Sequence, residues 1–252
     1  MAAEFRSYRN EAVVIKHQEW GEADRIVTLF TRQQGKINAL AKGVRKIRSR
    51  RAGHLEPFTH VSLQLAKGKD MPIITQTETI ESFPRLRDDL KRIGYASYAA
   101  ELLDRFASFE EQNDRLFNEF LETLERLNRD DYDARLVVRY FEMRLLDLAG
   151  FRPQLNTCVK NDEPIQPKDQ YFSAELGGAL CPIHGPGVAG AHPIGKDTLR
   201  YLRHLQRSSF KDAGKAHPTE AQHTQMELVM QDYLTYILER GLNSVKFIRR
   251  VR

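Results

Sequence analysis

The sequence has few cysteines and no long apolar run. Two cysteines in 252 residues cannot supply a disulfide framework. No stretch approaches the roughly 18 consecutive apolar residues that cross a bilayer, and the opening residues lack the apolar core of a signal peptide. We therefore expect a cytoplasmic protein whose thiols are free or bound to a metal.

Common catalytic motifs are also missing. The chain has neither the glycine-rich loop that ends in Gly-Lys-Ser/Thr and cradles phosphates, nor the HExxH helix of zinc proteases. No internal repeat is visible. These absences give no support to an ATPase or a zinc protease.

Acidic residues are absent from two segments. Residues 32–51 hold eight Lys/Arg and residues 240–252 hold five, with no Asp or Glu in either segment. The net charge is +5, so the rest of the chain carries −8. A solvated charge run could serve solubility alone, but mixed signs would serve it equally well. Segregated basic segments on an acidic body favour a polyanionic partner such as nucleic acid.

The first third of the chain has the pattern of short β-strands. The composition, 41% hydrophobic and 29% charged, suits a globular protein of one to three domains. Runs rich in Val, Ile, Thr and Phe, several of them alternating, are separated by turn residues. They predict strands at 11–17, 24–31, 36–42, 60–66 and 73–81. Such a set favours a small closed barrel, of which the five-stranded oligonucleotide-binding (OB) fold is one example.

After Pro84 the apolar residues recur at helical spacing. The pattern predicts one or two helices through about residue 108, then one capped by Asn113, and another over 132–149 that ends at Gly150 and Pro153. Residues 151–195 have an irregular pattern rich in proline and glycine. Two more helices are expected near 196–207 and 219–240, the second with a capping box that begins at Thr219. Domain boundaries are expected near residues 82 and 151.

The cationic cluster follows the third predicted strand, between Gly43 and Pro57. A loop beside a small barrel can place several cations along one phosphate backbone, and each neutralised phosphate releases a condensed counterion. No base-reading helix is visible, so we expect binding without sequence specificity. Trp20, Phe30 and Phe58 could stack on bases, but each is more typical of a core residue. The predicted contacts are Arg32 and Lys36 at the rim, with Lys42, Arg45, Lys46, Arg48, Arg50 and Arg51 along the path.

Five short motifs follow one another over residues 21–61: a Gly-Glu-x-Asp turn, a Leu-Phe-Thr strand end, a Gly-Lys strand, an Ala-Lys-Gly-x-Arg-Lys segment and a Leu-x-Pro-Phe step. Their residues are Gly21, Glu22, Asp24, Leu29, Phe30, Thr31, Gly35, Lys36, Ala41, Lys42, Gly43, Arg45, Lys46, Leu55, Pro57 and Phe58. This order of motifs resembles the N-terminal domain of the bacterial recombination mediator RecO family. No single motif is specific to the family, but the five in this order are. The stretch LLDLAGFRPQLNTC at 145–158 also fits the family.

This resemblance implies an α+β protein in which an N-terminal five-stranded OB-like barrel precedes an α-helical domain carrying a zinc-ribbon-like insert. The implied domains are 1–82, 83–150, 151–195 for the insert and 196–252 for the C-terminal helices. The family implies a DNA-binding protein rather than an enzyme. It implies binding of single- and double-stranded DNA, strand annealing and association with the nucleoid. It further implies partnership with RecR and the single-stranded-DNA-binding protein in loading RecA.

The metal site implied by the family is degenerate in this chain. Members that bind a metal have two Cys-x-x-Cys pairs around zinc. Here the pairs read Cys158-Val-Lys-Asn161 and Cys181-Pro-Ile-His184, which leaves Cys158, Cys181 and His184 as good ligands. Asn161 is a poor fourth ligand, although Asp162 or His192 could substitute. A metal-free, hydrogen-bonded remnant is our first expectation and bound zinc the second.

Two other functions fit parts of the sequence. Cys181 and His184 could act as nucleophile and base of an enzyme, but no carboxylate is fixed nearby to orient the histidine. An RNA-binding barrel of the translation machinery is also possible, because the fold accepts either polymer. The terminal segment 243–252 is expected either to add a second nucleic-acid contact or to be disordered without function.

Overall fold

The computed structural model describes residues 7–239 and 241–251, which form two compact units. Unit 1 comprises the described residues up to Arg129 together with Val251, and unit 2 comprises Asp130–Arg250. The predicted boundary near 82 lies inside unit 1, where strands give way to helices. Among the described residues, no helix is both long and apolar enough to cross a membrane.

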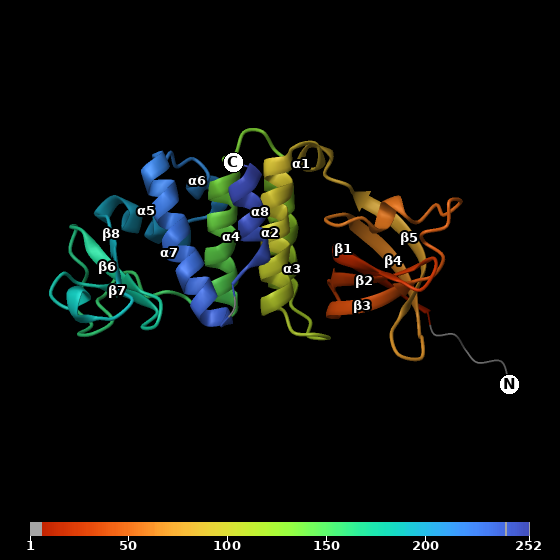
Figure 1. Ribbon diagram of the computed structural model, residues 1–252, viewed down its shortest axis with the longest axis horizontal. Helices are drawn as coiled ribbons and strands as arrows, with labels where there is room; N and C mark the ends of the chain where they lie inside the picture. The colour runs from red at the N-terminus through yellow and green to blue at the C-terminus, as the bar shows by residue number, and fades with distance from the viewer. Residues whose placement is uncertain (1–6, 240, 252) are drawn as a thin grey trace. The chain divides into compact units, whose positions relative to one another are not determined.

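Unit 1 begins with a closed five-stranded barrel, drawn in red to orange in Figure 1. The strands lie in the order β1-β2-β3-β5-β4, and β3 and β5 pair in parallel through Leu40 and Ile73. The other neighbouring strands are antiparallel. The predicted OB-like barrel is confirmed. The strands are β1 (Ser7–Trp20), β2 (Asp24–Thr31), β3 (Gly35–Ala41), β4 (His60–Ala66) and β5 (Ile73–Glu81).

The barrel core is formed by the alternate residues that the sequence pattern placed on one face. Ile37, Ala39 and Ala41 of β3 are buried there together with Val61, Leu63 and Leu65 of β4. The connection between β3 and β4 adds Val44 and Leu55, both fully buried. Leu55 belongs to a short 3-10 turn, η1 (Gly53–Leu55). These two residues attach both ends of the cationic segment to the barrel.

Three helices complete unit 1: α1 (Pro84–Asp88), α2 (Leu90–Phe106) and α3 (Asp114–Leu127). The Asn113 side chain accepts a hydrogen bond from the Leu116 N–H, which confirms the predicted cap of α3. Asp89 caps α2 in the same way, through the N–H groups of Lys91 and Arg92.

The turn between β2 and β3 packs against the connection between α2 and α3. Gly35 has a φ of +64°, and a Cβ there would lie 1.9 Å from the carbonyl oxygen of Glu111. The Glu110 N–H donates to the Lys36 carbonyl over 3.0 Å, and the rings of Phe30 and Phe117 lie 6.1 Å apart. Only glycine allows this close backbone approach. The Gly-Lys pair of the sequence motif therefore joins the barrel to the helices.

Unit 2 combines five helices with a three-stranded sheet in the order β7-β6-β8. The sheet lies within 151–195, where an irregular chain was predicted. That prediction was wrong for these strands, because segments of three or four residues are too short to show a period. The helices are α4 (Ala134–Leu148), α5 (Lys196–Arg207), α6 (Phe210–Ala213), α7 (Glu220–Leu238) and α8 (Asn243–Val251); the strands are β6 (Gln170–Ser173), β7 (Gly178–Leu180) and β8 (His192–Ile194).

Residues 243–251 of the C-terminal basic segment form helix α8, so of the two alternatives given for this segment the disordered one does not hold. Leu242 and Ile248 are buried, which explains why the segment is ordered. Lys246 is exposed. Arg240 and Arg252, which also belong to this basic segment, lie outside the described residues.

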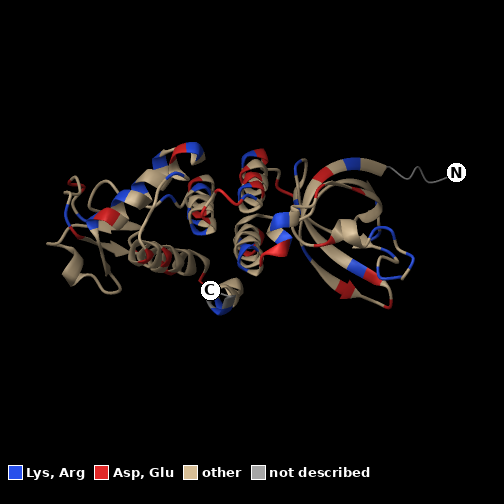
Figure 2. Cartoon of the chain, turned by 90° about the horizontal axis from the view of Figure 1, so that it is seen from above, with Lys and Arg blue, Asp and Glu red and all other residues tan. Residues whose placement is uncertain are grey.

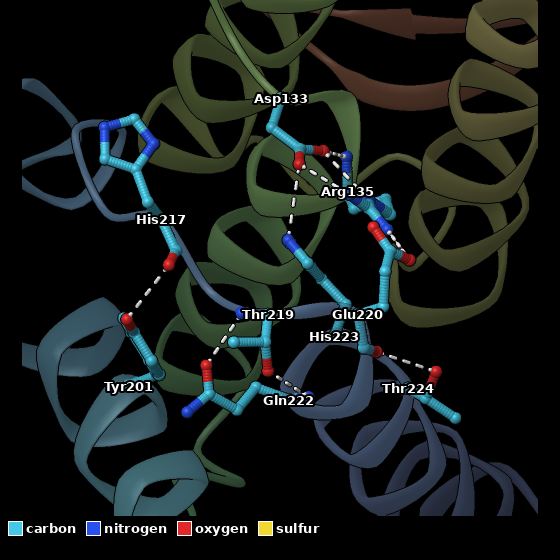
Figure 3. Close-up of polar contacts among 9 residues, drawn as sticks. All are labelled: Asp133, Arg135, Tyr201, His217, Thr219, Glu220, Gln222, His223 and Thr224. Carbon is cyan, nitrogen blue, oxygen red and sulfur yellow. Dashed lines mark hydrogen bonds and ion pairs between the residues drawn. The ribbon is translucent and has the colours of Figure 1, made fainter.

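The beginnings of α4 and α7 are joined by polar contacts (Figure 3). Thr219 and Gln222 form the predicted capping box of α7, with the Thr219 N–H donating to Gln222 Oε1 over 2.7 Å. Asp133 caps α4 and also lies 3.3 Å from Nε2 of His223 on α7. The Asp133–His223 contact, which the sequence analysis did not predict, thus connects the two helices.

Candidate nucleic-acid interface and metal site

The connection between β3 and β4 is held in a defined shape; we call residues 42–51 the cationic loop. Its backbone is hydrogen-bonded to the β1–β2 turn, because the Arg45 N–H donates to the Ala23 carbonyl over 2.9 Å and the Gly43 N–H to Asp24 Oδ1 over 2.6 Å. Gly43 adopts a φ of +65°, which lets the chain turn away from β3. The loop is therefore a fixed feature of the barrel surface.

Five of the predicted contacts are exposed on this loop, and Figure 2 shows their blue segments gathered at one end of the barrel. For four of them the described residues supply no ion pair, so their charges face solvent. The cations of the predicted path thus lie on one continuous stretch of chain. The exposed residues are Lys42, Arg45, Lys46, Arg48 and Arg50.

Arg45 is partly neutralised and Arg51 has a structural role. Arg45 Nη2 lies 3.1 Å from Glu19 Oε2, although that carboxylate is itself well exposed and the pair is weak. The Arg51 guanidinium donates to the Ile74 carbonyl over 2.7 Å and to the Lys42 carbonyl over 2.6 Å. Arg51 therefore holds the loop against β5 and contributes less to a phosphate path than predicted.

Arg32 lies between the barrel and α3 in unit 1. Its Nε and Nη2 donate to the two carboxylate oxygens of Glu11 over 2.8 and 3.0 Å, and Nη1 donates to Asn118 Oδ1 over 2.7 Å. The hydrogen bonding between the Arg32 guanidinium and the Glu11 carboxylate is the main cause that lowers the pKa of Glu11. The guanidinium also lies 4.4 Å from the centroid of the Phe117 ring. All its donor groups thus have protein partners or an aromatic face beside them.

Lys36 is buried rather than placed at a rim. Its Nζ donates to the Asp104 carbonyl over 2.5 Å, lies 3.6 Å from Asp104 Oδ1 and sits 4.4 Å from the Phe109 ring centroid. Only 8% of its side chain is exposed. A phosphate could not reach this ammonium group without moving the helices, so a DNA-binding role for Lys36 does not fit the structure.

The three aromatic candidates for base stacking fall into two classes. Phe30 and Phe58 are buried, as expected of core residues. Trp20, at the end of β1, is 55% exposed. The sequence pattern could not separate them, because all three lie in or beside strands.

The second candidate site is formed by Cys158, Cys181 and His184 in unit 2. His184 Nδ1 lies 3.3 Å from the Cys181 sulfur and 3.6 Å from the Cys158 sulfur. The Cys181 N–H donates to the Cys158 sulfur over 3.4 Å. Burial opposes ionisation of Cys158, but this hydrogen bond and those from Lys160 and His184 outweigh it and lower the pKa of the thiol to about 7.

The three side chains fit a tetrahedral metal ion. Ligand atoms around zinc lie about 3.5 Å apart, as follows from metal–ligand bonds of about 2.0–2.3 Å. The His184 nitrogen lies close to both cysteine sulfurs. This arrangement is typical of three ligands around one metal ion, whereas a catalytic nucleophile and its base would need only one sulfur beside the histidine. Asp162 and His192 are not part of this group among the described residues. His192 instead lies 3.9 Å from Asp232 on α7, so the expected substitution of a fourth ligand by either residue is not seen.

Two family models together match most of the chain. The model described as the N-terminal region of Recombination protein O matches residues 5–83, and the model of its C-terminal region matches residues 87–246. The first covers the barrel with its cationic loop. The second covers the helices and the Cys/His group.

Curated relatives are similar over nearly the whole length. The DNA repair protein RecO of Roseiflexus sp. (strain RS-1) is 40% identical over 98% of this chain and 87% of its own length. The protein of the same name from Pelotomaculum thermopropionicum is 35% identical over 96% and 94%, respectively. That from Dehalococcoides mccartyi (strain CBDB1) is 32% identical over 97% and 96%.

Proposed function

Because the chain belongs to the Recombination protein O (RecO) family of DNA repair proteins, we propose that its cationic loop binds the phosphate backbone of single- and double-stranded DNA. We expect binding without sequence specificity, because the cationic side chains contact phosphates, which are the same at every nucleotide. Four exposed cations without an acidic partner among the described residues carry this proposal: Lys42, Lys46, Arg48 and Arg50.

The same surface supports strand annealing without ATP. Two complementary strands repel each other through their phosphates, and a loop that neutralises phosphates on both strands lowers that repulsion. A defined loop on a closed barrel can hold a strand while its bases remain free to pair. We propose this as the chemical contribution of the protein to repair, with no covalent step.

Family membership also supports a mediator role with protein partners. We propose that the protein acts together with RecR and the single-stranded-DNA-binding protein, and that it helps to load RecA onto coated DNA. Loading of RecA on single-stranded DNA coated by the binding protein, with and without this chain and RecR, tests this part. Equal loading rates would contradict it.

The DNA-binding proposal is tested by the salt dependence of affinity. A variant with Lys42, Lys46, Arg48 and Arg50 replaced by alanine should lose affinity for a labelled 20-nucleotide strand. Each single-strand contact contributes about 0.7 to the slope of log affinity against log salt. The slope should therefore flatten by roughly 3, and the annealing rate of complementary strands should fall with it.

A matched control removes the same charge from unit 2. Lys160, Lys168, Lys211 and Lys215 are exposed lysines whose replacement by alanine also changes the net charge by −4. This control should retain most of the slope. Equal flattening in both variants would mean that net charge rather than the cationic loop drives binding.

RNA binding is the alternative that the same surface allows. Competition between single-stranded DNA and RNA of equal length separates the two, and we expect DNA to compete at least as well as RNA. A clear preference for RNA would favour a role in the translation machinery instead.

A further inference from the structure

Two large apolar side chains are exposed at the end of the barrel that carries the cationic loop. Ile47 lies in the middle of the loop with a relative exposure of 105%, and Trp20 at the end of β1 is 55% exposed. Lys46 and Arg48 flank Ile47 directly and are exposed as well. Because the Ile47 side chain is fully exposed to water, it does not stabilise the barrel core, and its position between two cations needs another explanation.

The two residues belong to segments that are hydrogen-bonded to each other. Trp20 directly precedes the β1–β2 turn, whose Ala23 carbonyl accepts the Arg45 N–H over 2.9 Å. The Arg45 side chain also donates to the Glu22 carbonyl over 3.3 Å and pairs with Glu19, the neighbour of Trp20. Trp20 therefore lies beside the base of the loop whose tip carries Ile47.

The chemistry of this surface matches an unpaired base between phosphates. An indole ring offers a flat face of about the size of a base, and stacking on it does not depend on sequence. Ile47, fully exposed between two cations, can pack against the face of a neighbouring unstacked base, and this contact removes apolar surface from water. The flanking cations complement phosphates on either side of the base. In a duplex, by contrast, both faces of each base are covered by its neighbours.

We propose that Trp20 and Ile47 form a site for unpaired bases, with one base stacked on the indole of Trp20 and another in contact with Ile47. This inference rests on the proposed function of the cationic loop and deepens it. The phosphate contacts give affinity for any nucleic acid, and the two apolar residues add affinity for single strands only. The protein should thus prefer single-stranded over double-stranded DNA.

The experiment uses Trp20 as its own reporter, since it is the only tryptophan of the chain. Full-length protein is titrated with a labelled 20-nucleotide thymidine strand, an abasic strand with the same number of phosphates and a 20-base-pair duplex. Anisotropy of the label measures binding, and tryptophan fluorescence measures stacking. We expect the thymidine strand to quench the fluorescence, while the abasic strand binds more weakly and leaves it unchanged.

Variants separate stacking from charge. Trp20→Ala and Ile47→Ser should each weaken binding of the thymidine strand, by about 5- to 100-fold for Trp20, and should leave binding of the abasic strand unchanged. The matched control is Ile80→Ser, because Ile80 is a 52% exposed isoleucine on β5. It should bind all three ligands as the unaltered protein does. Thermal unfolding of each variant checks that the barrel is intact.

Each outcome decides between the two proposals. If the thymidine and abasic strands bind equally well without quenching, the base site is wrong while the phosphate-binding loop stands. If no strand binds, the proposed function fails and the base site fails with it. If vesicles rich in phosphatidylglycerol change the fluorescence and nucleic acids do not, the apolar pair contacts a lipid surface and the inference is overturned.

Discussion

Arg45 Nη2 lies 3.1 Å from Glu19 Oε2, and this ion pair links the cationic loop to the end of β1. It is the one carboxylate contact that the described residues make with the five exposed cations of the loop. The pair both positions Arg45 and neutralises it. Removing the carboxylate should therefore change DNA binding in a predictable direction.

Glu19→Gln should strengthen binding of single-stranded DNA. The substitution removes a negative charge beside the loop and frees the guanidinium of Arg45. Since an exposed ion pair is worth about 0.2–1 kcal/mol, we expect a gain of about 1.4- to 5-fold at low salt. Anisotropy titrations measure it. Glu78→Gln on β5 removes the same charge from an exposed position and is the control. Weaker binding by Glu19→Gln would show that positioning of Arg45 matters more than its charge.

Lys36→Ala should destabilise unit 1 without changing the salt slope of DNA binding. The substitution leaves Asp104 without a buried partner and removes the contact with the Phe109 ring. Because Asp104 also pairs with Lys16, we expect a loss of about 2 kcal/mol in the free energy of unfolding, less than for an isolated buried pair. Urea unfolding measures it, with the exposed Lys67→Ala as control. A flattened salt slope in folded Lys36→Ala would place Lys36 at the DNA after all.

Asn161→Cys should create a high-affinity zinc site. The turn that begins at Cys158 brings residue 161 back toward it, since the Asn161 N–H donates to the Cys158 carbonyl over 3.3 Å. A third thiolate completes four ligands around zinc. Competition with a chromogenic chelator should show tighter zinc binding than in the unaltered chain. Zinc should also raise the melting temperature, because a ligand of the folded state stabilises it.

The control for this prediction is Asn161→Ser, which supplies no comparable ligand. It should bind zinc no better than the unaltered chain. Metal analysis of protein purified without a chelator determines whether the native three-ligand group already holds zinc. If Asn161→Cys binds zinc no more tightly than Asn161→Ser, residue 161 does not reach the metal position.

Asp133→Asn should destabilise unit 2 at neutral pH and have less effect in acid. Burial opposes ionisation of Asp133, but hydrogen bonds from His223 and Arg135 outweigh it and lower the pKa well below its usual range (Figure 3). A lowered pKa in the folded state gives stability that is present above the unfolded pKa of about 4 and is lost as the pH falls below it.

We therefore expect Asp133→Asn to lose about 1–2 kcal/mol in the free energy of unfolding at pH 7, and the difference to shrink below about pH 4. Urea unfolding across this pH range measures it. Asparagine can still cap α4, so the measurement isolates the charge. Asp197→Asn is the control, because among the described residues Asp197 pairs with the exposed Arg200 alone, at 3.3 Å, and its replacement should cost little stability at any pH. A constant loss at all pH values would mean that the contact does not depend on ionisation.

The sequence predicted the barrel well because its strands are long enough to show alternation. Ile37, Ala39 and Ala41 share one face in the pattern and are buried together in the structure. The short strands β6 and β7 carry no such signal and were missed. Caps such as Asn113 and Thr219 were found because their hydrogen bonds join residues only three positions apart.

The strand pattern, the predicted helix caps, the family and the concentration of charge after β3 all follow from residues that are close together in the chain. Which cations face solvent depends instead on how distant segments pack. Lys36 and Arg48 have the same charge and the same basic surroundings in the sequence. Lys36 is buried against Asp104, whereas Arg48 is exposed, and this difference depends on a helix that lies far away along the chain. Local sequence patterns indicate secondary-structure propensity and charge, but the solvent exposure of a side chain depends on packing between segments that are distant in the chain.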